Sequence, residues 1–95
     1  MLELRFATEA DQDFRRLYAF IAELNPGAAD RLGIALQDRM ELLCASPDIG
    51  RPYAGSEDIR ESVLPFASTA YIIRYQLRSD CLLIVRIWNG REERS

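Results

Sequence analysis

The chain has 95 residues, of which 48% are hydrophobic and 28% charged, a composition that excludes a disordered protein and predicts one domain over residues 1–95. Its net charge is −3, with twelve arginines, no lysine and no histidine, so it lacks the surplus of cations with which nucleic-acid-binding proteins displace counterions. The absence of an apolar run of about 20 residues, and of a basic-then-apolar leader, predicts a cytoplasmic protein that does not enter a membrane.

The first predicted element is a short strand over residues 2–6, where apolar side chains alternate with charged ones. A helix over about residues 9–24 follows, because apolar residues recur there at helical spacing. Thr8 stands three residues before Asp11, a spacing typical of a capping box at the start of a helix. The chain should therefore pass from strand to helix within a few residues.

Asn25-Pro26 is expected to end this helix and begin another, because Asn caps helices well and Pro is tolerated in the first turn. Helical spacing continues from Ala28 to Leu43, and Ser46-Pro47 interrupts it. Two helices with so short a link form an antiparallel hairpin. The turn-rich residues 47–58 then predict a surface loop.

Three strands are predicted in the remaining sequence, at Ile59–Leu64, Tyr71–Leu77 and Cys81–Trp88, with a tight turn at residues 78–80. The order β-α-α-β-β-β favours an α+β fold, in which a helical hairpin packs on one face of an antiparallel sheet. Because the last strand is apolar on both faces, we expect it to be central.

Several kinds of chemistry lack the residues that they need. Without histidine, and with two widely separated cysteines expected to be free buried thiols, the chain has neither a zinc site nor a histidine-activated nucleophile. Its five scattered glycines form no phosphate-binding loop, so no cofactor is expected. Two acid pairs, Asp11 with Asp13 and Glu92 with Glu93, are better interpreted as solvated than as metal ligands.

Arginines on or beside the predicted sheet are the most informative polar residues. Several of them converging on one face would make a surface that recognises carboxylates or phosphates. The alternative is pairing with the chain's own acids, which stays open for Arg60 and Arg86 and is less favoured for the two arginines beyond the last strand. The candidates are Arg51, Arg60, Arg74, Arg86, Arg91 and Arg94.

Two large apolar residues lie off the apolar stripes of the predicted helices. Phe20 falls near the edge of the first stripe, and Ile34 falls almost opposite the second, one turn from Asp30 and from Asp38. We interpret Phe20 and Ile34 as contacts for a protein partner, with ordinary surface exposure as the alternative.

Several short segments also follow one another in a characteristic order. Together they span nearly the whole chain, and their order and spacing resemble the RelE/ParE toxin family. The segments are Ala22–Pro26, Ala28-Ala29, Ser46-Pro47, Gly50-Arg51-Pro52, Ile59-Arg60-Glu61, Tyr71–Tyr75 and Val85–Arg91.

This resemblance implies the toxin half of a bacterial type II toxin–antitoxin module. Each such toxin is neutralised by a cognate antitoxin whose C-terminal segment wraps around it in a hetero-oligomer. The RelE branch of the family cleaves mRNA on the ribosome, whereas the ParE branch poisons DNA gyrase. The two branches therefore imply an enzyme and an inhibitor, respectively.

The residues that separate the branches favour ParE. RelE-like nucleases have an arginine in the sheet at the position of Ile72. They have a second arginine after the glycine that follows the last strand, where this chain has Arg91 and then Glu92. Their C-terminal tyrosine would lie past Ser95. RNA cleavage without a metal also needs a group that moves a proton, and arginine is a poor base at neutral pH. We therefore expect no catalytic residues and no direct binding of nucleic acid.

The sequence thus predicts a ParE-like toxin that binds a protein target, DNA gyrase, and a cognate antitoxin. A ribosome-dependent mRNA interferase of the RelE type remains an alternative. An inactive interaction domain is a further alternative, because Asn89 replaces the histidine found before the glycine in many ParE-like sequences. The residues expected to bind the target or the antitoxin are Phe20, Ile34, Arg51, Arg60, Arg74, Trp88, Arg91 and Arg94.

Overall fold

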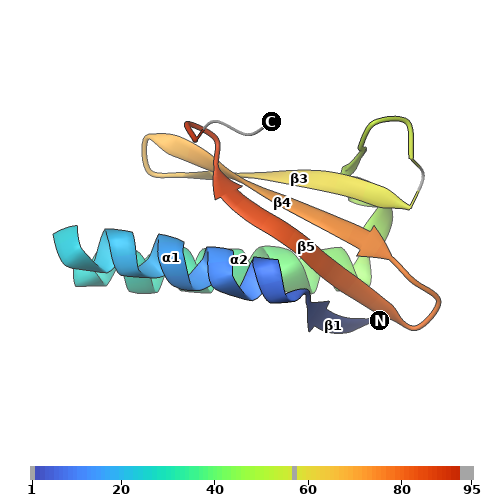
Figure 1. Ribbon diagram of the computed structural model, residues 1–95, viewed down its shortest axis with the longest axis horizontal. Helices are drawn as coiled ribbons and strands as arrows, with labels where there is room; N and C mark the ends of the chain where they lie inside the picture. Colours follow the sequence, from blue (N-terminus) through green and yellow to red (C-terminus); the bar gives the residue numbers. More distant parts are fainter. Residues whose placement is uncertain (1, 57, 93–95) are drawn as a thin grey trace.

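In the computed structural model of the chain, which describes residues 2–56 and 58–92, five strands form one sheet and two helices lie side by side on one face of it (Figure 1). The predicted α+β fold with a helical hairpin on one face is confirmed. The elements are β1 (Glu3–Phe6), α1 (Thr8–Leu24), α2 (Pro26–Ala45), a 3₁₀ turn (Pro47–Ile49), β2 (Arg51–Pro52), β3 (Ile59–Phe66), β4 (Thr69–Leu77) and β5 (Cys81–Asn89).

The first helix begins directly after β1, with only Ala7 between them. The Ala7 N–H donates to the Ile84 carbonyl of β5 at 2.9 Å, and the Ala7 carbonyl accepts the Asp11 N–H of the first helical turn at 3.1 Å. The capping box predicted at Thr8 is wrong, because Ala7 is the N-cap residue and Thr8 already belongs to the helix. Pairing with β5 keeps the chain extended through Ala7 and so decides where α1 starts.

Asn25 alone links α1 to α2. Its side-chain oxygen accepts the Ala28 N–H at 3.1 Å, as expected of an N-cap residue followed by proline. The second helix returns alongside the first and ends before Ser46-Pro47, so the predicted antiparallel hairpin is confirmed (Figure 1). Within the described residues, neither helix has the length and apolar content needed to cross a membrane.

The pairing of β1 differs from the prediction. Residues Glu3 to Phe6 run parallel to Cys81 to Ile84 of β5, whereas the other pairings are antiparallel, so the sheet is mixed and not antiparallel throughout. Figure 1 shows the reason: α1 continues in the direction of β1 without a turn between them. Because α1 does not reverse the chain after β1, the later reversals bring the chain into β5 in the same direction as β1.

The segment after α2 is more ordered than the predicted surface loop. Gly50 is buried, and Arg51–Pro52 forms the edge strand β2 against Arg60 and Glu61 of β3. The proline is tolerated there because an edge strand has one side without ladder partners. The three later strands match the prediction, and β5 lies inside the sheet between β1 and β4, as predicted.

The hydrophobic core lies between the helical hairpin and the sheet. Both cysteines, Cys44 and Cys81, are buried and free, as predicted. The largest fully buried side chains come from α2, β4 and β5 and are Leu32, Leu36, Leu43, Ile73, Tyr75, Leu82, Ile84 and Ile87.

Tyr75 connects the segment just before β2 to this core through hydrogen bonds. Its hydroxyl donates to the Pro47 carbonyl at 2.7 Å and accepts the Gly50 N–H at 3.0 Å. A Cβ at Gly50 would lie 2.3 Å from the same oxygen, so glycine is required for this approach. Burial raises the pKa of the Tyr75 hydroxyl and keeps it neutral, so it can serve as both donor and acceptor.

We predict that Tyr75→Phe lowers the free energy of unfolding by about 1–3 kcal/mol, because it leaves the buried Gly50 N–H and the Pro47 carbonyl without their partner. Urea denaturation measures this change. Tyr53→Phe is the matched control, since Tyr53 is 38% exposed. An equal loss in both variants would contradict the role assigned to Tyr75.

Candidate functional site

Strand pairing places three arginines and one glutamate in a row across the sheet. Arg51 of β2 pairs with Glu61 of β3, Glu61 pairs with Arg74 of β4, and Arg74 pairs with Arg86 of β5. Direct cross-strand partners share a face of a sheet. Cross-strand pairing therefore places these three arginines in one row with a carboxylate among them, but their guanidinium groups do not converge, because Arg86 pairs with Asp13 of α1.

Three side chains hold Arg74 within this row. Its Nε and one terminal nitrogen donate to the same oxygen of Glu61 at 3.0 and 2.8 Å. Its guanidinium also stacks between two rings, 3.9 Å from the centroid of Tyr53 and 4.9 Å from that of Trp88. Of the predicted site residues, Arg74 and Trp88 are thus brought together, but the charge of Arg74 is already neutralised.

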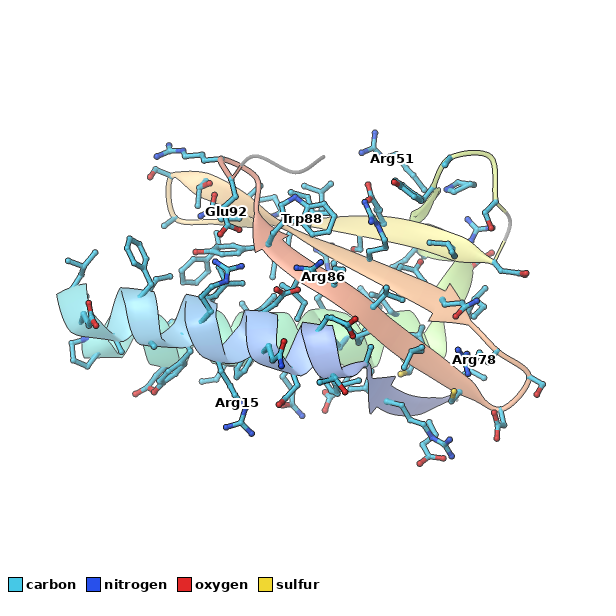
Figure 2. All side chains as sticks on the ribbon, in the orientation of Figure 1. Arg15, Arg51, Arg78, Arg86, Trp88 and Glu92 are labelled. Carbon is cyan, nitrogen blue, oxygen red and sulfur yellow. The ribbon has the colours of Figure 1, made fainter. Side chains whose placement is uncertain are left out.

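Arg86 turns toward the first helix and is neutralised there. It donates from two nitrogens to the two oxygens of Asp13, at 2.8 and 3.0 Å, and the Ile87 N–H donates to the same carboxylate at 2.9 Å. Figure 2 shows Arg86 between β5 and α1, whereas Arg51 points away from the molecule. Pairing with the chain's own acids, left open by the sequence, is confirmed for Arg86.

Asp13 is only 5% exposed, so the prediction that this acid is solvated is wrong. Burial alone would raise the pKa of Asp13, but the hydrogen bonds from Arg86 and from the Ile87 backbone outweigh it and hold that pKa below its ordinary value. Asp13 lies three residues after Ala10 and four before Leu17, on the buried face of α1, and this spacing could have identified it. Within residues 2–56 and 58–92, no three side chains of metal-ligating type form a cluster.

The other predicted arginines do not join one site. Arg60 donates to the carbonyls of Asp48 and Gly50, at 3.3 and 2.8 Å, and so holds the chain that follows α2. Arg91 is exposed and donates to the Ser68 carbonyl at 3.0 Å. Arg94 lies outside the described residues.

Phe20 and Arg91 meet in a groove of about 570 Å³ between α1 and the end of β5, which we call the C-terminal groove. Phe20 is 65% exposed, which confirms that it lies off the buried stripe. The apolar wall of the groove consists of Leu17, Phe20, Ile21 and Tyr71, and its polar rim consists of Arg16, Asn89, Arg91 and Glu92.

Asn89 builds the rim of the C-terminal groove. Its side-chain oxygen accepts the Arg91 N–H at 2.9 Å and the Thr69 hydroxyl at 3.0 Å. Its own N–H donates to Glu92 at 2.7 Å, and the Glu92 carboxylate also accepts from Arg16. Asn89 therefore shapes the turn that follows β5.

Ile34 lies in a different groove, which follows the junction of α1 and α2 and which we call the hairpin groove. It is 63% exposed, as predicted, and Asp30 and Asp38 lie beside it in the wall. Phe14 and Gly33 lie in the same wall. The two apolar residues predicted to contact a partner thus belong to separate surfaces.

We predict that Asp13→Asn lowers the free energy of unfolding at neutral pH by about 1.5–3 kcal/mol, because it removes charge-assisted hydrogen bonds. A carboxyl whose pKa is lowered by folding stabilises the fold above its unfolded pKa of about 3.9. This contribution is lost as the pH falls through the folded pKa.

The difference between wild type and Asp13→Asn should therefore shrink below about pH 4, as measured by denaturation at a series of pH values. Asp11→Asn is the control, because the Asp11 side chain is 53% exposed and pairs with Arg15 at the surface. A difference that stays constant with pH would rule out ionised Asp13 as its source.

Comparison with known proteins agrees with this architecture. Residues 4–94 match the model of a family described as the ParE toxin of the parDE type II toxin–antitoxin system. Toxin RelE1 of Caulobacter vibrioides is 38% identical over 88 residues, covering 93% of this chain and 92% of its own. Toxin RelE3 of the same organism is 29% identical over 94 residues, covering 99% and 100%.

A solved structure of the chromosomal ParDE toxin–antitoxin system from P. aeruginosa shares the fold. It superposes with a TM-score of 0.73 at 20% sequence identity, covering 94% of this chain and 96% of the other. The family match extends over almost the whole chain and the related toxin is of nearly the same length. The chain therefore belongs to the ParE toxin family of type II toxin–antitoxin systems.

Proposed function

We propose that this toxin acts in the cytoplasm by binding a protein target, DNA gyrase, and that a cognate antitoxin neutralises it in a hetero-oligomer. The observation that carries the proposal is the internal neutralisation of two sheet arginines. Arg74 is paired with Glu61 and Arg86 with Asp13, so two cations that could stabilise a scissile phosphate are already bound to carboxylates. This arrangement supports binding of a protein over cleavage of RNA.

The C-terminal groove is the proposed contact with the target. It combines an exposed aromatic side chain, Phe20, with the exposed cation of Arg91. Aromatic residues and arginines contribute most of the binding free energy at protein interfaces. Arg51 lies apart from this groove, on β2, and offers a second exposed cation to a large partner.

A ribosome-dependent mRNA interferase is the second candidate. It is favoured by the names of two relatives, Toxin RelE1 and Toxin RelE3, and by the row of arginines across the sheet. Mapping mRNA 5′ ends after induction separates the two candidates, because an interferase produces new ends in phase with codons. Unchanged 5′ ends together with growth arrest support the binding mechanism.

We predict that the purified toxin inhibits supercoiling of a relaxed plasmid by DNA gyrase at micromolar concentration. Relaxation of the supercoiled form of this plasmid by an unrelated topoisomerase serves as the control and should be unaffected. Circular dichroism verifies that the toxin is folded. Undiminished supercoiling by gyrase in the presence of folded toxin would eliminate gyrase as the target.

We also predict that Phe20→Asp weakens target inhibition at least tenfold, about 1.4 kcal/mol or more, while the melting temperature changes little. Leu24→Asp is the matched control, because Leu24 is 77% exposed at the end of α1 and does not line the C-terminal groove. Loss of folding in Phe20→Asp would show that the residue belongs to the core. Equal effects of both variants would place the contact elsewhere.

A further inference from the structure

The wall of the C-terminal groove contains a hydroxyl that the described part of the chain does not use. Tyr71 is 2% exposed and lines this groove, and its hydroxyl makes no hydrogen bond within residues 2–56 and 58–92. Among these residues, the one fully buried side-chain polar atom without a partner is the Arg60 Nε, so the Tyr71 hydroxyl still reaches solvent. Tyr75, two residues along β4, has both of its partners inside the fold. Because buried tyrosine hydroxyls usually find a partner, Tyr71 offers a donor to whatever enters the groove.

Two cations stand at the rim of the C-terminal groove, and the chain neutralises them to different degrees. Arg91 is exposed, and its side chain donates to the Ser68 carbonyl, which carries no net charge. The Arg16 side chain is 48% exposed and forms ion pairs with Glu92 and, at 3.7 Å, with Asp13. Within the described part of the chain, Arg91 therefore keeps an unpaired charge, whereas Arg16 shares its charge with two carboxylates.

Glu92 is a carboxylate of the chain itself that already occupies this rim. One of its oxygens accepts from Arg16, and the other accepts the Asn89 N–H at 2.7 Å. The Glu92 side chain is 32% exposed, so its pair with Arg16 lies at the surface, where an ion pair contributes little to stability. A carboxylate from another protein can therefore replace Glu92 on Arg16 at little cost to the fold. The apolar wall beside these cations favours a protein segment over a phosphate.

We propose that the C-terminal groove binds an acidic segment of the target, in which a large apolar side chain lies next to an aspartate or glutamate. This inference rests on the proposed function, which places the target contact in this groove, and it adds the chemistry of the bound segment. The apolar side chain packs against Phe20 and Leu17, and the Tyr71 hydroxyl donates to an oxygen of the segment. The carboxylate takes the place of Glu92 on Arg16. Glu92 is thus an internal competitor that weakens binding of the target.

The test measures the dissociation constant of the full-length toxin and purified DNA gyrase by biolayer interferometry at several salt concentrations. Growth arrest on induction, compared at equal toxin abundance, is a second readout that does not assume gyrase as the target. Glu92→Gln should lower the dissociation constant at least threefold, because it frees Arg16 while the amide oxygen still accepts the Asn89 N–H. Binding by this variant should also depend more steeply on salt, because the rim becomes more positive. A variant that merely loosened the turn after β5 would bind more weakly.

Tyr71→Phe should raise the dissociation constant at least tenfold and leave the melting temperature unchanged, because the hydroxyl has no partner in the described part of the fold. Tyr18→Phe is the matched control. Tyr18 is 37% exposed, lines the hairpin groove and donates to Asp30, so its loss of a hydroxyl should change the dissociation constant less than twofold. A lower melting temperature for Tyr71→Phe would show that this hydroxyl serves the fold instead.

The groove assignment and the proposed function fail separately. Weaker or unchanged gyrase binding by Glu92→Gln, or unchanged binding by Tyr71→Phe, would overturn the groove assignment and leave gyrase as the target. If gyrase does not bind, but growth arrest is stronger with Glu92→Gln and weaker with Tyr71→Phe, the groove assignment holds and gyrase is not the target. If gyrase does not bind and growth arrest is absent or equal in all three proteins, both are overturned.

Discussion

The carboxylate of Asp13 joins the helical hairpin to the sheet at the point where β1 stops. β1 pairs with β5 only as far as Ile84, and Asp13 then accepts the Ile87 N–H and binds Arg86 through two hydrogen bonds. A carboxylate buried this deeply is stable only when it is paired and hydrogen-bonded. This contact holds α1 against β5 and thereby forms the C-terminal groove on one side of the helix, leaving the hairpin groove on another.

Pairing of charges inside the chain also determines which charges remain at each surface of the toxin. Arg74 and Arg86 pair with carboxylates of the chain, so these two arginines stabilise the fold and are not available to a ligand. The two grooves of the described surface both have apolar walls, but the charged residues at their rims differ. Aspartates border the hairpin groove, whereas Arg16 and Arg91 border the C-terminal groove together with Glu92. Two partners of unlike composition could therefore bind one small domain without competing for the same residues.

Local sequence patterns predicted the helices and the three long strands well, because helical spacing marks the helices, β-branched and aromatic residues mark the strands, and Asn25 marks the boundary between the helices. The signal at Thr8 misidentified the N-cap of α1, which is Ala7. What they missed depends on distant partners. β2 is too short to show a pattern and exists through pairing with Arg60 and Glu61, and the parallel direction of β1 follows from the path of the whole chain. At the site, exposure of Phe20 and Ile34 was predictable from helical angles, whereas the pairing of Arg86 with Asp13 joins residues 73 positions apart.

The stack of Tyr53, Arg74 and Trp88 gives the toxin an internal optical reporter. Trp88 is the only tryptophan of the chain, is 7% exposed, and has a guanidinium 4.9 Å from the centre of its ring. Indole emission responds to nearby charge and to solvent access. A ligand that displaces Arg74 would therefore change the fluorescence, whereas a partner bound in the hairpin groove, which Trp88 does not line, would leave it nearly unaltered. One spectroscopic titration of the unmodified protein can thus distinguish which face a partner occupies.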